Sequence, residues 1–183
     1  MKTLIIHPED NTTTFLEGIY APIEDKTVIR GGVSKTEVML EIMKHDRVMM
    51  MGHGSPAGLF AIGQFSNCRS AYIIDHDTVP LLKEKKDNVY IWCNADKFVE
   101  YFGLLGFYSG MFISEIGEAT YCGLPGMTQE IIDESNYGFT NIIAKYINED
   151  RGVIHENVKR EYALIAENNP VALYNNNRLY KAF

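Results

Sequence analysis

Two short apolar runs constrain the fold of this chain most strongly. Residues 48–51 read VMMM and residues 89–92 read VYIW. Neither run alternates apolar with polar residues, as a strand with one face in water would. Such runs are typical of central strands in a parallel sheet, which is covered by helices on both faces. Parallel strands also need long crossover connections, usually helices, so the two runs predict an α/β fold.

The remaining patterns agree with this prediction, because short apolar runs alternate with helical periodicity along the chain. The clearest helix start is Ser34, an N-cap residue followed three positions later by Glu37 in a capping box. Strands are expected at residues 3–7, 26–32, 48–53, 58–64, 71–75 and 88–96, with a short strand inside 110–123. Helices are expected at residues 34–46, 78–86, 96–107, 128–150 and 153–167. Residues 171–183 fit either a hairpin or an extended tail. Together these elements predict a three-layer sandwich with a mostly parallel central sheet.

Length and charge narrow the class of protein. The 183 residues suit a single domain spanning 1–183. The net charge of −7 and the absence of a Lys/Arg-rich run argue against nucleic acid as a partner. The apolar runs are too short to cross a membrane, and the opening MKTLIIHPEDN is too short for a secretory leader. We therefore expect a cytoplasmic protein without a membrane partner.

The cysteines give little sign of a disulfide or metal framework. There are three, Cys68, Cys93 and Cys122, and no CxxC or HxxxH pair accompanies them. An odd number without close pairing fits reduced thiols, and the spacing argues against a structural zinc site. We expect Cys68 and Cys122 to be structural and no metal to be bound.

Two of the predicted strands end in reactive side chains. His53 lies between Gly52 and Gly54, and Cys93 follows the second apolar run. Sites in open α/β sheets form outside the carboxyl ends of the strands, so neighbouring strands would bring both side chains to one edge. A thiolate can then act as nucleophile while the imidazole transfers its proton. Gly54 has no Cβ, so its N–H can approach a substrate carbonyl, with the N–H of Cys93 as second oxyanion donor.

A hydrophobic strand ending in His-Gly, followed forty residues later by a hydrophobic strand ending in Cys and small residues, resembles the caspase, legumain and gingipain group of cysteine peptidases. The resemblance covers residues 47–96, although the segment IWCNADK has no QACRG-type motif. It implies a caspase-like fold, His53 as general acid/base, Cys93 as nucleophile and Gly54 as an oxyanion donor. It also implies a reaction that needs no cofactor and acts on peptide or protein substrates.

The sequence thus predicts a cysteine endopeptidase that works through a thioester. Asp75 is a candidate for the substrate pocket, where a carboxylate would bind a basic side chain; alternatively it caps the helix near Thr78. The acidic residues at 115–118 and 133–134 are expected on solvated helix faces. Three alternatives stay open: a non-catalytic module with the same fold, a flavodoxin-like ligand-binding domain, and thiol chemistry on a small-molecule amide. The sequence does not predict an oligomeric state.

Overall fold

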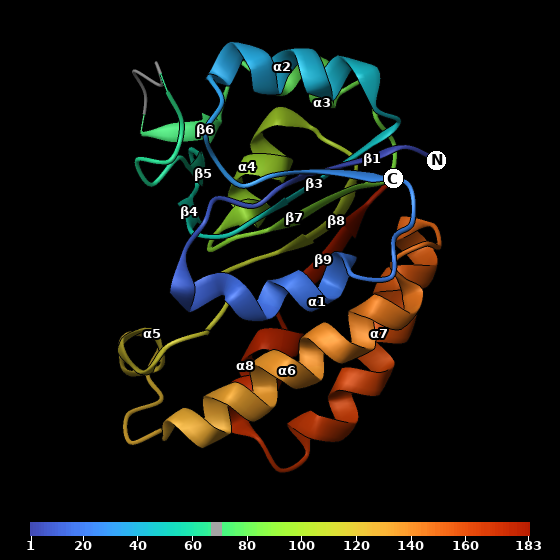
Figure 1. Ribbon diagram of the computed structural model, residues 1–183. Helices are drawn as coiled ribbons and strands as arrows, with labels where there is room; N and C mark the ends of the chain where they lie inside the picture. The colour runs from blue at the N-terminus through green and yellow to red at the C-terminus, as the bar shows by residue number, and fades with distance from the viewer. Residues whose placement is uncertain (67–70) are drawn as a thin grey trace.

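A computed structural model describes residues 1–66 and 71–183, so Cys68 lies outside the described residues (Figure 1). Its main feature is a six-stranded sheet in the order β2-β1-β3-β7-β8-β9. The strands are β1 (Thr3–Ile6), β2 (Lys26–Ile29), β3 (Arg47–Met51), β7 (Asn88–Ile91), β8 (Gly106–Ser109) and β9 (Leu179–Ala182). The first five are parallel, and β9 pairs with β8 in the antiparallel direction. The prediction of a mostly parallel central sheet is confirmed.

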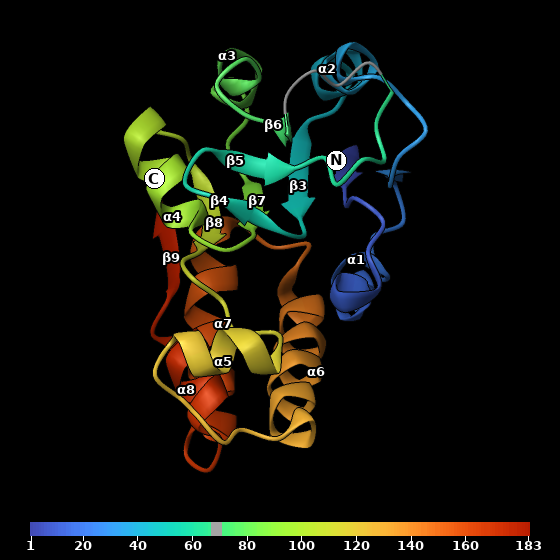
Figure 2. The ribbon, with the colours of Figure 1, turned by 90° about the vertical axis from the view of Figure 1, so that its left-hand side faces the viewer.

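Helices cover both faces of this sheet, as the two ribbon views show (Figures 1 and 2). One face carries α2 (Lys35–Lys44), α3 (Val79–Leu82) and α4 (Ala95–Phe102). The other carries the 3₁₀ helix η1 (Asn11–Leu16), α1 (Glu17–Tyr20), α6 (Gln129–Tyr146), α7 (Arg151–Ala166) and α8 (Pro170–Asn176). Met50 packs into the first layer and Met49 and Met51 into the second. This double burial explains why the run VMMM does not alternate.

The carboxyl ends of the five parallel strands lie on one side of the molecule, which faces the viewer in Figure 2. A small antiparallel sheet lies there, formed by β4 (Gly54–Ser55), β5 (Gly58–Phe60) and β6 (Tyr72–Ile74). The short helix α5 (Ile116–Tyr121) follows β8 on the same side. Within the described ranges, none of the helices has both the length and the apolar character that a membrane crossing requires.

Several local predictions are confirmed and others are wrong. The capping box of Ser34 and Glu37 starts α2 as expected. The helix expected at 96–107 instead ends at Phe102, because Gly103 takes a left-handed conformation with φ of +61°. Residues Gly106–Ser109, which read GFYS, are all buried and form β8. The helix expected at 78–86 is a single turn, Val79–Leu82.

The end of the chain forms neither a hairpin nor a tail. Residues 170–176 form α8, and residues 179–182 form β9. Asn175 is fully buried, and its side-chain amide bonds both the N–H and the carbonyl of Ile113, at 2.7 and 2.9 Å. The sequence does not distinguish a buried, hydrogen-bonded asparagine from an exposed one. The asparagines of this segment therefore gave no sign that it forms a buried helix.

Candidate functional site

The register of β3 and β7 decides where His53 and Cys93 lie. These strands are parallel neighbours, and Met51 pairs with Ile91. His53 and Cys93 each lie two residues beyond these paired strand ends, so both emerge at the same edge of the sheet. Both line one small cavity of about 20 Å³, together with Phe112 and other residues of that face. The structure therefore brings the two predicted site residues together.

A chain of hydrogen bonds orients the imidazole of His53. The Thr12 hydroxyl donates to Asp10 Oδ1 at 2.5 Å. Because its proton is used there, Thr12 Oγ1 accepts from the Nε2–H of His53 at 2.6 Å. In the neutral ring the lone pair is then on Nδ1, so this nitrogen is the one that can act as a base. The hydrogen bonds from the Thr12 hydroxyl and N–H lower the pKa of the Asp10 carboxyl, so it remains an acceptor.

Sequence reasoning missed this relay of Asp10 and Thr12, although one signal pointed to it. The segment follows β1, and β1 is the other neighbour of β3. The carboxyl end of β1 therefore lies beside that of β3, where His53 emerges. Asp10 is also the N-cap of η1 and accepts the N–H of Thr12 at 2.8 Å, which fixes the turn.

Cys93 lies in the turn between β7 and α4. The next residue, Asn94, has a φ of +66°, a left-handed conformation that is uncommon outside glycine and turns the strand sharply into the helix. The half-buried thiol lies 3.4 Å from two acceptors, the carbonyl of Phe112 and Oε1 of Glu118. Burial, followed by the charge of Glu118, raises the pKa of the Cys93 thiol to about 12. Cys93 is therefore a neutral thiol at physiological pH in this arrangement.

The carboxylate of Glu118 is held firmly beside the sulfur. Its Oε2 accepts from the N–H and hydroxyl of Ser114 at 2.7 and 2.9 Å, and from the N–H of Glu115 at 3.2 Å. The prediction that Glu118 belongs to a solvated helix face is wrong, since this side chain joins the start of α5 to Cys93. In the described part of the chain, no hydrogen bond joins Cys93 directly to His53.

Gly54 has a packing reason to be glycine. A Cβ at this position would lie 2.3 and 2.6 Å from two ring atoms of Trp92, too close for any side chain. The Trp92 indole N–H also donates to the carbonyl of Ser55 at 3.1 Å, which ties β4 to the end of β7. Gly52, and not Gly54, lines the cavity. An oxyanion role for the Gly54 N–H stays a prediction.

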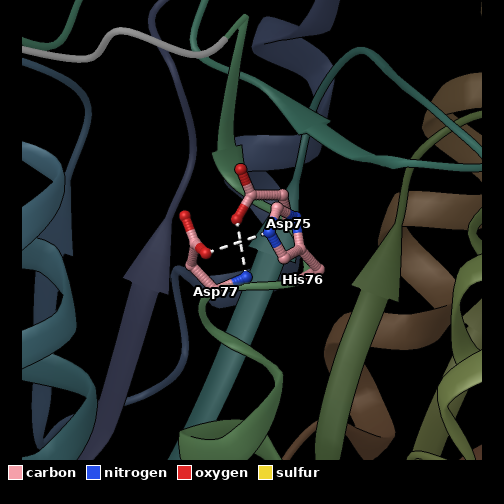
Figure 3. A group of neighbouring side chains, drawn as sticks. All are labelled: Asp75, His76 and Asp77. Atoms are coloured by element: carbon pink, nitrogen blue, oxygen red, sulfur yellow. Dashed lines mark hydrogen bonds and ion pairs between the residues drawn. The ribbon is translucent and has the colours of Figure 1, made fainter.

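Asp75 lies away from this cavity and is already paired. Its buried carboxylate bonds the ammonium of Lys35 at 2.6 Å. It also accepts the N–H of Asp77 at 3.0 Å (Figure 3). This turn precedes α3, but the N-cap of that helix is Thr78 and no side chain caps it, so Asp75 does not act as the cap that was the alternative to a substrate pocket. Asp75, His76 and Asp77 bring ligand atoms within 4.8 Å of one another. The ammonium of Lys35 forms ion pairs with both carboxylates, so we interpret the group as an ion-pair cluster.

No known protein-family model matches the chain, and no curated protein matches it either. A thiol and an imidazole line one small cavity at the carboxyl edge of a parallel sheet, and the carboxylate of Glu118 lies 3.4 Å from the sulfur. A thiol and an imidazole are the two groups that nucleophilic catalysis by a cysteine requires.

Proposed function

We propose that this protein is a cysteine peptidase with a caspase-like fold, in which Cys93 and His53 hydrolyse peptide bonds. One observation carries the proposal: β3 and β7 are paired neighbours, and the two side chains that follow them line one cavity. The relay through Thr12 to Asp10 supports it, because it presents Nδ1 of His53 as a base. The left-handed turn at Asn94 supports it further, since strained residues cluster at active sites.

In the proposed mechanism, Nδ1 of His53 takes the proton of the Cys93 thiol and the sulfur attacks the carbonyl carbon of the peptide bond. The N–H groups of Cys93 and Gly54 stabilise the resulting oxyanion. His53 then returns its proton to the leaving amine, the C–N bond breaks and a thioester remains. His53 next removes a proton from water, which attacks the thioester, and the departing sulfur regains that proton. Each cycle consumes one water and restores the thiol.

The contact between Cys93 and Glu118 has a consequence for this mechanism. The thiol cannot transfer its proton to His53 while it donates to the Glu118 carboxylate or to the carbonyl of Phe112. The negative charge also opposes formation of the thiolate. The proposal therefore requires the segment that begins α5 to move away from Cys93 before each reaction, so this structure represents a resting form.

The same contact favours a second candidate, a non-catalytic module with this fold. A thiol whose pKa is raised to about 12 is a poor nucleophile, and its hydrogen bond to Glu118 ties α5 to the sheet. In that case Cys93 serves packing, and the contact with Glu118 is permanent. Thiol reactivity separates the two candidates, because a module gives Cys93 no reason to react faster than an ordinary cysteine.

The test is cleavage of a diverse peptide library by the full chain, with products identified by mass spectrometry. We expect cleavage to be lost in Cys93→Ala and in His53→Ala and retained in Cys122→Ser, the matched control at another half-buried cysteine. A peptide electrophile should label Cys93 faster than Cys122. If Cys93→Ala cleaves as well as the unchanged protein, or Cys93 is labelled no faster than Cys122, the peptidase proposal is wrong.

A further inference from the structure

The cavity that His53 and Cys93 line is too small to hold a substrate side chain. Its volume of about 20 Å³ has room for about one water molecule. A preference for one kind of neighbouring residue must therefore come from the surface around the cavity. The small sheet of β4, β5 and β6 adjoins it, because β4 begins directly after His53 (Figure 2).

The small sheet has one fully buried face and one half-buried face. Leu59 of β5 pairs with Ile74 of β6, and both side chains are buried in the core. Phe60 follows Leu59, so its side chain lies on the opposite face. Phe60 pairs with Tyr72 and not with Ile73, because a β-bulge adds one residue to β6 at this point. Bulges re-aim side chains in this way and are frequent beside active sites.

The bulge brings two aromatic rings together on the half-buried face. The rings of Phe60 and Tyr72 are stacked, with their centroids 5.1 Å apart and an angle of 24° between their planes. Both residues keep part of their surface exposed. The hydroxyl of Tyr72 also lies 3.0 Å from the hydroxyl of Ser55, and this hydrogen bond fixes the tyrosine ring to β4. Phe60 and Tyr72 thus form a fixed apolar surface, which we call the aromatic platform.

The aromatic platform lies directly beside His53. Gly54 of β4 pairs with Leu59 of β5, and the pairing continues by one residue, because the N–H of Phe60 donates to the carbonyl of His53 at 2.9 Å. Residues directly opposite each other in an antiparallel pair have Cβ atoms about 4.5–5.5 Å apart. A substrate residue next to the bond that Cys93 attacks can therefore place its side chain on the platform.

We infer that the aromatic platform binds an aromatic side chain of the substrate, from a residue next to the bond that is cleaved. An aromatic side chain gains from offset or edge-to-face packing on such rings in addition to the burial of apolar area, which an aliphatic side chain does not. The inference rests on the proposed function, because the peptidase reaction defines the substrate. Binding of the aromatic ring itself does not depend on catalysis.

The platform is therefore tested first without catalysis. Full-length Cys93→Ala is titrated with the N-acetyl amides of phenylalanine, leucine and lysine, and binding is followed by NMR. We expect the phenylalanine compound to bind at least threefold more tightly than either of the others. Phe60→Leu should weaken its binding at least threefold, while Tyr101→Leu, which removes an exposed ring on α4 outside the platform, should leave it unchanged. If Phe60→Leu lowers the melting temperature, Tyr72→Leu provides the same test.

The binding results decide the inference in either direction. Equal or tighter binding of the leucine compound, or unchanged affinity in both Phe60→Leu and Tyr72→Leu, would overturn it. Tighter binding of the lysine compound would show that the rings attract a cation instead, and would overturn it as well.

Cleavage then separates the platform from the peptidase. A peptide with phenylalanine next to the scissile bond should have a kcat/KM at least tenfold higher than the same peptide with alanine there. Phe60→Leu should reduce this ratio at least threefold, and Tyr101→Leu should preserve it. A ratio that Phe60→Leu leaves unchanged, or a preference for a charged residue on both sides of the bond, overturns the inference and leaves the peptidase proposal standing. Selective binding of the phenylalanine compound without cleavage of any peptide supports the platform and contradicts the proposed function.

Discussion

Replacing Glu118 by glutamine should make Cys93 more reactive. Oε1 of Glu118 lies 3.4 Å from the sulfur, and its charge is one cause of the raised pKa of the thiol. The glutamine oxygen can keep the bonds from Ser114, because these all reach Oε2. Its amide group would then face the sulfur as a donor in place of a negative charge. The substitution removes the repulsion and preserves the shape of the turn.

The size of the effect follows from the short distance. Two unit charges about 4 Å apart interact by about 1 kcal/mol in water and about 4 kcal/mol at an effective dielectric constant of about 20. At about 1.4 kcal/mol per pKa unit, the loss of the Glu118 charge lowers the pKa of Cys93 by about one to three units. The thiolate fraction rises by the same power of ten, while a less basic thiolate loses roughly half of that gain in nucleophilicity. The net expectation is a rate of alkylation about 3-fold to 30-fold higher.

The assay is alkylation by iodoacetamide at about pH 8, with each cysteine quantified separately by mass spectrometry. Glu130→Gln is the matched control, because this exposed glutamate on α6 has no contact with Cys93. Cys122 gives an internal reference within each sample. An unchanged rate at Cys93 in Glu118→Gln, with the melting temperature preserved, would show that burial alone sets its reactivity and would refute the reasoning.

Three further predictions test other parts of the structure. Thr12→Val removes the acceptor of the His53 Nε2–H, so ¹⁵N NMR should show that the ring no longer keeps a single tautomer. The value of kcat/KM for a cleaved peptide should fall about tenfold or more. An unchanged tautomer would contradict the hydrogen-bond relay. Gly54→Ala forces a Cβ into the ring of Trp92 and should lower the free energy of unfolding, measured in urea, by about 1–3 kcal/mol. The fluorescence of Trp92, the single tryptophan, should change as well. Unchanged stability and emission would contradict the clash. Burial lowers the pKa of His7 to about 4, so its ring should stay neutral as pH falls through 6.5, and an NMR midpoint above about pH 6 would exclude this. As the pH falls, the imidazole of His7 takes up a proton in the unfolded chain before it does so in the folded one. The free energy of unfolding therefore decreases from about pH 6.5 down to about pH 4.

The sequence predicted the sheet and its two reactive strand ends because those features are local. Uninterrupted apolar runs indicate burial on both faces, and the rule that sites form at the carboxyl ends of strands then places His53 and Cys93 at one edge of the sheet. That β3 and β7 are neighbours was an assumption, which the observed strand order satisfies. The capping box of α2 was predictable for the same reason, since all of its partners lie within one helical turn.

The features that were not predicted depend on contacts between distant parts of the chain. Glu118 approaches Cys93 from 25 positions away in the sequence, and a solvated acid has the same local pattern as one fixed beside a thiol. Asp133 and Glu115 likewise meet only because α6 packs beside the segment that precedes α5. The helix over residues 170–176 was missed because its buried asparagine is satisfied by a backbone 62 positions earlier. The local sequence pattern does not show which distant residues will contact one another.

The pairing of β9 with β8 has a consequence for how the chain is made. β8 ends at Ser109, while β9 begins at Leu179. During synthesis, the outer edge of β8 therefore stays unpaired until about 70 further residues have been added, which takes roughly 4–14 s at about 5–20 residues per second. Throughout that interval a nascent chain presents a row of free N–H and C=O groups that can pair with another nascent chain. Translation speed across α6 and α7, and not only final stability, should therefore influence how much of the protein aggregates in the cell.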